Sequence, residues 1–474
     1  MLRALFSRLM GGRPSPAPAK SVSEIDTGRL DAVAPERVAA PAEQGAQSAQ
    51  SFLCREVVLD GDQGVAGYEF QLRRGAGSRL LAQSRRVQHL QNEVLVRNLV
   101  QHAVHKMLGP RVTFVPVIDS FAASPVLRQM PPHGVVIVLQ QGTGEKPDGT
   151  ELLDQVRELR QAGFCVALEE CFDAPYFGQL APTVDYFVVD VAARNPVSLR
   201  MLMAGLAKIN PEATTVAKGV SGPEDFEVVR KLGFKRFQGP FVTRREDWKT
   251  NTLAPDGLRV CELLNRLRRD ADTEDLANII RLDPLLSFRM LRYLNSAAFG
   301  LQKKSASVKD ALLMMGRSQL YRWLTLLLFH TGNSREGASA LMETALLRGR
   351  FMELAGRGLA SPALREGLFV TGLFSMLDLV LKVPLTEVLR QVQLAEEIPA
   401  ALLHNEGIYA PYVELALASE SFDQERIAAA AAACGLDAEA VNRCQAEALH
   451  WAQQVETYPG NHAAGAAPTM GSRR

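Results

Sequence analysis

The sequence lacks the features of secreted, membrane-spanning and nucleic-acid-binding proteins. Its six cysteines are scattered over 474 residues without a Cys-x-x-Cys pair, which is typical of a protein in a reducing compartment. No apolar run approaches the roughly 18 residues that a membrane-spanning helix needs. The 53 basic and 52 acidic side chains almost cancel, so no overall field attracts nucleic acid or an anionic membrane. These absences predict a cytoplasmic protein without a transmembrane segment.

The two ends of the chain lack what a folded core requires. Residues 11–50 contain no aromatic side chain and are rich in Ala, Ser and Pro, so they bury too little apolar area to offset their ordering entropy. We therefore expect a disordered segment at 1–50 and a flexible tail at 456–474. Apolar residues recur at helical spacing within residues 1–10, and both a short amphipathic docking element and a frayed chain start remain open there.

Short apolar runs alternate with helical runs over residues 51–245. Continuous apolar runs at 135–140, 164–170 and 186–191 indicate strands of a parallel sheet that is buried on both faces. Two β-rich runs around a DGDQG turn predict a hairpin over 54–72. With about seven or eight such strands, a (β/α) barrel is favoured over an open doubly wound sheet.

The pattern becomes helical throughout residues 255–455, which we expect to form an all-α domain. Asp283 is placed as the N-cap of one helix and Pro284 as its first residue. Ser307 is placed to begin the next helix and Gly316 to end it.

Two sets of motifs resemble known bacterial signalling domains. The first half contains, in order, GYEFQLR (67–73), ALEECF (167–172), VDYFVVD (184–190), VAKGV (216–220) and LGFKRFQG (232–239). These resemble the EAL domain, a barrel that hydrolyses cyclic-di-GMP with two divalent metals. The second half contains LDPLLSFRMLRYLNSAAFG (282–300), SVKDALLMMG (307–316) and GLFSMLDLVLKVPLTEVL (372–389). These resemble the HDOD domain, a helical relative of metal-dependent HD phosphohydrolases.

The resemblance implies an EAL-HDOD signalling protein. Its fold would be a TIM-like (β/α) barrel of EAL type over 51–245, followed by a helical HDOD domain over 255–455. Its site would keep Glu69 of the E-A-L motif and Asp190, with Glu169 and Glu170 in place of the Asp-Asp pair. Four other family positions have changed: Pro116 for asparagine, Val138 for glutamate, Val188 for lysine and Lys218 for glutamate.

The charge inversion at Lys218 decides the prediction for the site. An ammonium group repels a divalent cation, and two of the other replacements have no side-chain oxygen to compensate. We therefore expect no metal or other cofactor, and a protein that is not an enzyme. Its barrel would act as a scaffold or sensor, and its HDOD domain would bind other signalling or regulatory proteins.

Two other functions remain open: residual cyclic-di-GMP phosphodiesterase activity, and a receptor that binds cyclic-di-GMP without cleaving it. Arg73 stands at the arginine that contacts the dinucleotide in the family, whereas Gln71 replaces an apolar residue near the guanine. No nucleic-acid partner is expected, because the one dense basic cluster, at 265–270, is typical of a solvated helix face. A homo-oligomer also remains open.

Histidines are too few for a second metal site. No histidine of the helical region is followed by aspartate, and Ser375 and Met376 stand where an HD doublet would be sought. His330 follows an apolar helical run, where a cation would favour the helix dipole. His102 and His105 lie three residues apart without an evident third ligand, so we expect helix surface residues there.

Overall fold

The computed structural model describes most of the chain between residues 51 and 456. The described residues are 51–73, 84–104, 109, 111–245, 248, 251–294, 307–329, 331, 338–359, 361–421 and 423–456. The ends predicted to be disordered or flexible, 1–50 and 456–474, lie outside them except for Glu456, which ends the last helix, and His105 and His330 also lie outside. The described chain divides into a large unit, Ser51–Asp270 with Tyr321–Thr457, and a small unit, Ala271–Leu320.

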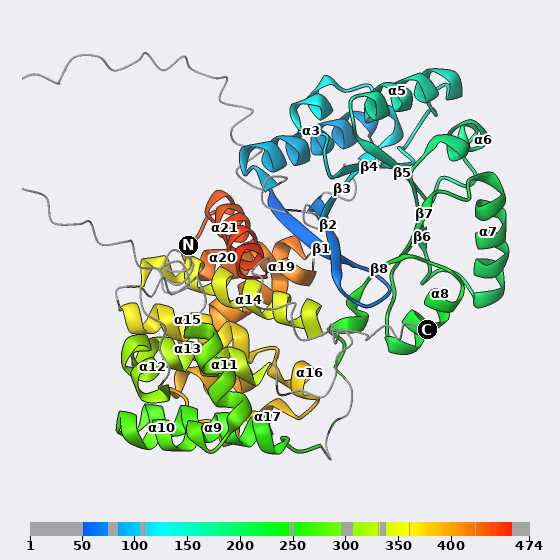
Figure 1. Ribbon diagram of the computed structural model, residues 1–474. Coiled ribbons are helices and arrows are strands. Elements are labelled where there is room, and N and C mark those ends of the chain that lie inside the picture. The colour runs from blue at the N-terminus through cyan, green and yellow to red at the C-terminus, as the bar shows by residue number, and fades with distance from the viewer. Residues whose placement is uncertain are drawn as a thin grey trace, which may run out of the picture. The chain divides into compact units, whose positions relative to one another are not determined.

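A closed barrel forms the first part of the large unit, with its strands in chain order (Figure 1). The strands are β1 (Phe52–Leu59), β2 (Val65–Arg73), β3 (Val112–Ile118), β4 (Val135–Gln140), β5 (Cys165–Glu169), β6 (Tyr186–Asp190), β7 (Thr214–Lys218) and β8 (Arg236–Gln238). β1 is antiparallel to both β2 and β8, and the other neighbouring pairs are parallel. The predicted TIM-like barrel and its opening hairpin are therefore confirmed.

The hairpin turn between β1 and β2 is held by the side chain of Asp60. Asp60 Oδ1 accepts hydrogen bonds from the backbone N–H of Asp62 at 3.0 Å and of Gly64 at 2.8 Å. An aspartate at the start of a turn stabilises it in this way. The local sequence DGDQG thus sets the turn, and the turn fixes the register in which Glu56 lies opposite Glu69.

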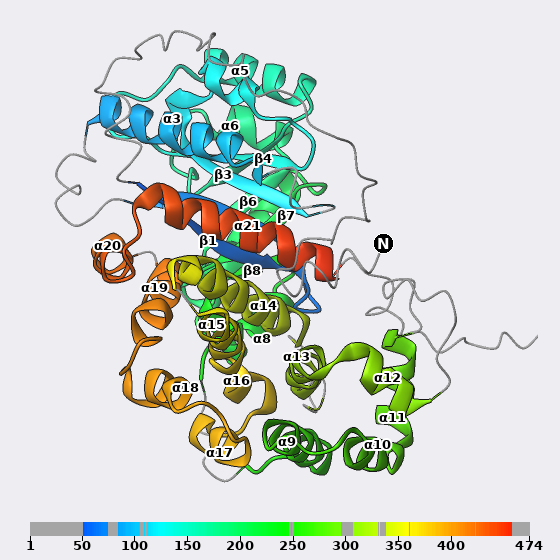
Figure 2. The same ribbon diagram turned by 90° about the vertical axis from the view of Figure 1, so that its left-hand side faces the viewer.

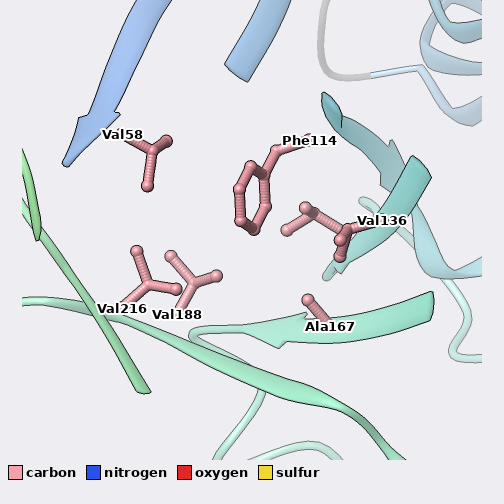
Figure 3. Packing of buried hydrophobic residues seen from close by; sticks show 7 residues of the cluster. Val58, Phe114, Val136, Ala167, Val188 and Val216 are labelled. Atoms are coloured by element: carbon pink, nitrogen blue, oxygen red, sulfur yellow. The ribbon is translucent and has the colours of Figure 1, made fainter. Parts of the chain in front are cut away.

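Apolar side chains fill the barrel interior (Figure 3). The cluster consists of Val58, Phe114, Val136, Val138, Ala167, Val188 and Val216. Inward residues alternate with outward residues along a strand, as Val136 and Val138 of β4 show. Val138 and Val188, which the resemblance to the EAL domain places at polar positions of that domain, are almost fully buried and extend this apolar core.

Five described helices follow the barrel strands on the outside (Figure 1). They are α3 (Arg85–Gln101), α5 (Gly149–Gln161), α6 (Phe177–Leu180), α7 (Pro196–Ile209) and α8 (Pro223–Lys231). Asp148 caps α5 by accepting hydrogen bonds from two backbone N–H groups, and Asn195 caps α7. These caps begin the helices directly after the loops at the carboxyl ends of the strands.

The rest of the large unit is helical, and we call it the helical half. It comprises α9 (Pro255–Arg268), the residues from Tyr321 of α13 (Arg317–Leu328), α14 (Ala338–Ala355), α15 (Pro362–Phe374), α16 (Leu377–Leu381), α17 (Leu385–Gln391), α18 (Glu397–Pro399), α19 (Ala410–Ser421), α20 (Gln424–Ala433) and α21 (Ala438–Glu456). α19 and α21 pack against β1, and Figure 2 shows α21 beside this strand. The helical half thus covers the face of β1, which the hairpin leaves without a barrel helix of its own.

The small unit contains α10 (Thr273–Arg281), α11 (Pro284–Leu294) and α12 (Val308–Met315). Asp283 Oδ1 accepts hydrogen bonds from the N–H groups of Leu285 and Leu286, both at 3.0 Å, so the predicted cap of α11 is confirmed. Ser307 caps α12, which ends at Gly316 with a φ of +72°, a conformation that favours glycine.

The length and apolar character of the helices bear on whether any of them could span a membrane. Within the described part of the chain, no single helix is long and apolar enough to cross a membrane. One bent pair, Ala363–Leu381 with Leu385–Gln391, reaches that length and composition when the two helices are taken together.

Candidate functional site

Three charged side chains from β2, β5 and β7 meet at the carboxyl ends of the barrel strands, which we call the barrel mouth. Lys218 Nζ lies 2.9 Å from Glu69 Oε1 and 2.9 Å from Glu169 Oε1. The side chain of Lys218 is 19% exposed, whereas that of Glu69 is only 2% exposed. One ammonium group therefore joins three strands, and we call these three residues the lysine clamp.

Glutamine amides complete the surroundings of the clamp. Gln71 Nε2 donates to Glu69 Oε1, and Gln238 Nε2 donates to Glu69 Oε2 at 3.2 Å. Gln140 Nε2 donates to Glu169 Oε2 at 2.9 Å. Both oxygens of each clamp carboxylate thus have a partner within the protein. This arrangement satisfies buried charge without an added ion.

Burial and attraction act in opposite directions on the charged groups of the clamp. Burial lowers the pKa of Lys218, but the carboxylates of Glu69 and Glu169 outweigh it, and the net pKa lies above its usual value. Burial raises the pKa of Glu169, Lys218 opposes this, and Glu69 adds to it. The lysine therefore stays protonated throughout the neutral pH range.

The residues of the mouth do not fit the two divalent cations of the EAL family. Hard cations need several oxygen ligands, and here an ammonium group already stands between the two nearest carboxylates. Pro116 of β3 lies opposite Val138 of β4, so neither strand offers a side-chain oxygen at that level. Over the described ranges, no group of three or more His, Cys, Asp or Glu side chains is arranged to hold a metal ion.

Glu170, predicted to act beside Glu169, belongs to a different network. Its carboxylate binds Arg194 through two hydrogen bonds, at 2.9 and 2.8 Å, and also accepts one from the N–H of Asp190 at 2.7 Å. The guanidinium of Arg194 lies 5.5 Å from the ring centroid of Phe172. The backbone of Glu170 is left-handed, with a φ of +49°. The pair predicted from adjacent sequence positions thus divides between two cations.

The other predicted residues occupy separate places. Asp190 ends β6, pairs in register with Lys218, and accepts a hydrogen bond from the N–H of Ala192 at 3.0 Å. Arg73 ends β2, but its side chain lies outside the described residues. Sequence reasoning did not single out Gln140 or Arg194. Gln140 could have been found as a polar residue that ends an apolar strand beside Glu169, whereas nothing in the loop sequence marks Arg194.

The helical half has its own charged network at the position where an HD doublet would be sought. Ser375 Oγ accepts a hydrogen bond from Arg348 Nη1 at 2.7 Å. Arg348 also binds both carboxylate oxygens of Glu420, at 3.0 and 2.6 Å. Asp378 is buried and forms an ion pair with Arg245, which follows β8. Guanidinium groups thus surround this position.

The chain is similar to an HDOD domain and to two bacterial proteins. The family model described as "HDOD domain" matches residues 258–382. Cyclic di-GMP phosphodiesterase CdgJ of Vibrio cholerae is 23% identical over 410 residues, covering 85% of this chain and 93% of the relative. The uncharacterized protein YuxH of Bacillus subtilis is 22% identical over 413 residues, covering 85% of this chain and 98% of the relative.

Solved structures with an EAL domain also resemble part of the chain. The Bacillus subtilis YkuI protein, solved with c-di-GMP and calcium, has a TM-score of 0.36 and 13% identity, covering 53% of this chain and 77% of that one. An EAL domain protein from Listeria monocytogenes has a TM-score of 0.33 and 14% identity, covering 44% of this chain and 94% of that one.

The expectation that the protein is not an enzyme is contradicted by these comparisons. CdgJ, which aligns with most of the chain, is named a cyclic di-GMP phosphodiesterase. The replacements at the mouth argue against one arrangement of two metal ions, but they do not show that the protein lacks activity. The inference from Lys218 to an inactive protein was therefore too wide.

Proposed function

Because the chain has the EAL-HDOD architecture, a barrel of EAL type followed by an HDOD domain, we propose that it is a sensor and scaffold of cyclic-di-GMP signalling. In this proposal the barrel, over 51–245, responds to a ligand at its mouth. The helical domain, over 255–455, binds regulatory proteins of the same network. A cytoplasmic location and a homo-oligomer are further parts of the proposal.

The lysine clamp is the observation that carries the sensor role. Cyclic-di-GMP is anionic, and an anionic ligand at the mouth needs a cation to bind. Lys218 and Arg194 are cations of the mouth. Lys218 already binds the carboxylates of Glu69 and Glu169, and Arg194 binds that of Glu170. A ligand that bound Lys218 would have to displace a carboxylate from it. Binding would then change the contacts among β2, β5 and β7, which is what a sensor requires.

Phosphodiesterase activity is the second candidate function. It is favoured by the name of CdgJ and by the share of both chains that the alignment covers. In the described geometry Lys218 holds both clamp carboxylates, so turnover would require the clamp to open. This candidate therefore predicts activity that depends on Glu69 and rises when Lys218 is removed.

One assay separates the two candidates. The purified full chain is mixed with cyclic-di-GMP and manganese, and both binding and linear product are measured. Saturable binding without product, weakened about tenfold or more by Arg73→Ala, is the result expected for the sensor. Linear product that Glu69→Gln abolishes would instead establish the phosphodiesterase. If neither binding nor product is observed, a cyclic-di-GMP role for this barrel is overturned.

The scaffold role needs a separate measurement. It predicts a stoichiometric complex between the full chain and one regulatory protein, rebuilt from two purified components. Cyclic-di-GMP should change the affinity of that complex if the barrel is the sensor. A complex whose affinity is the same with and without the dinucleotide would remove the sensor role and leave the scaffold alone.

A further inference from the structure

The strand that carries Glu69 also contacts the helical half. Neighbouring side chains of a strand point to opposite faces, so Glu69 faces the mouth and Tyr68 faces outward from β2. The hydroxyl of Tyr68 donates a hydrogen bond to Glu343 of α14. Tyr68 is 3% exposed and Glu343 is 1% exposed, so this contact is closed to solvent. One residue of β2, Glu69, therefore lies in the lysine clamp, and the residue before it, Tyr68, binds the helical half.

The same carboxylate holds a second strand of the barrel. Arg111 directly precedes β3, and its guanidinium forms an ion pair with Glu343 Oε1. β2 and β3 are parallel neighbours, paired in register from Gly67 with Val112 to Glu69 with Phe114. Glu343 thus joins two adjacent strands from outside the barrel, close to where Lys218 joins β2 to β5 and β7 from inside.

Glu343 has few ways to move without losing its partners. A buried carboxylate needs hydrogen bonds and a counter-charge, and Tyr68 and Arg111 supply both. Burial, followed by the charge of Glu343, raises the pKa of Tyr68 well above its usual value, so the hydroxyl remains a donor. A shift of α14 would therefore carry β2 with it or leave a buried charge unpaired.

We propose that Glu343 is a positioning residue for the lysine clamp: through Tyr68 and Arg111 it fixes β2, and with β2 the carboxylate of Glu69 that Lys218 binds. A protein that binds the helical half and shifts α14 would then loosen or tighten the clamp. This last consequence rests on the proposed function, whereas the link between Glu343 and the clamp does not.

The chemical reactivity of Lys218 tests the link directly. Only an unprotonated amine reacts with an acetylating reagent, and the clamp keeps Lys218 protonated. Glu343→Gln removes the ion pair with Arg111, and Tyr68→Phe removes the hydrogen bond. Each should raise the acetylation rate of Lys218 about threefold or more, since half a pKa unit changes the unprotonated fraction by about that factor. Peptide mass spectrometry of the full chain measures the rate, with the exposed Lys208 as internal reference.

Glu420→Gln is the matched control. Glu420 also binds an arginine of α14, but that arginine, Arg348, contacts Ser375 rather than a barrel strand. Glu420→Gln should leave the reactivity of Lys218 unchanged even if it lowers stability. The proposal is overturned if Tyr68→Phe, the milder change, leaves Lys218 as slow as in the parent protein, or if Glu420→Gln accelerates it equally. Because the assay contains neither cyclic-di-GMP nor a partner, its failure would not touch the proposed function.

Discussion

The lysine clamp of the barrel mouth and the arginine network of the helical half both pair carboxylates with a cation of the chain, but the cations differ. In the mouth, Lys218 lies partly exposed between Glu69 and Glu169. In the helical half, Arg348 is 4% exposed and binds Glu420 and Ser375 through three hydrogen bonds. A guanidinium is always charged and has donors in a fixed plane, whereas an ammonium is a mobile point charge. We therefore infer that the arginine network of the helical half is a fixed part of the structure, whereas the lysine clamp of the mouth can rearrange.

Arg348→Met should have the largest effect on stability. It leaves Ser375 Oγ and both carboxylate oxygens of Glu420 without the buried guanidinium that donates to them. Breaking a buried pair by removing one partner lowers the free energy of unfolding by about 3 kcal/mol. Urea unfolding followed by tryptophan fluorescence measures the change. A loss below about 1 kcal/mol, which is ordinary for an exposed ion pair, would remove the distinction between the two networks.

Lys218→Met should have a smaller effect that depends on pH. It leaves the Glu69 and Glu169 carboxylates near each other without their shared cation. Because Lys218 is 19% exposed, we expect a loss of about 2 kcal/mol at pH 8, between the values for exposed and buried pairs. The pKa of Glu169 is already raised by burial, and removal of Lys218 removes the group that opposes this. A carboxyl group with a raised folded-state pKa binds a proton on folding, so the variant should recover stability as the pH falls.

Unfolding at pH 8 and at pH 5.5 measures this dependence for the parent and for Lys218→Met. The gap between the two proteins should narrow at pH 5.5, because Glu169 is then protonated more readily in the variant. Arg348→Met is the control, since its arginine network lies away from Glu169 in the helical half. A gap that is constant with pH would show that the clamp carboxylates do not depend on Lys218 for their charge.

The barrel was predictable from sequence because buried parallel strands consist of continuous runs of apolar residues. The run at 135–140 became β4, and the hairpin around Asp60 followed from its turn residues. The meeting of Glu69, Glu169 and Lys218 was also accessible, because motifs at the ends of successive strands converge at one end of a barrel.

Two contacts of the site could not be predicted from the sequence. The separation of Glu170 from Glu169 depends on a left-handed backbone at Glu170, and only the folded loop determines this. The bond between Tyr68 and Glu343 joins residues 275 positions apart, and no local pattern encodes such a pairing. Both depend on tertiary structure, which brings in partners that neither motif contains.

The smallest predicted effect concerns manganese and sharpens the comparison between the two networks. Lys218→Met leaves the carboxylates of Glu69 and Glu169 without their shared cation, and carboxylate oxygens are ligands that a hard cation can bind. Manganese at tenfold its dissociation constant should stabilise this variant by about 1.4 kcal/mol, seen as a rise in Tm. The parent should not respond, because its ammonium group holds the position, and Arg348→Met should not respond, because it frees the single carboxylate of Glu420. Lys218→Met with Glu169→Gln should lose the response. An equal rise in Tm for the parent protein would mean that manganese binds beside Lys218 or displaces it, and the clamp would then no longer distinguish the mouth from the helical core.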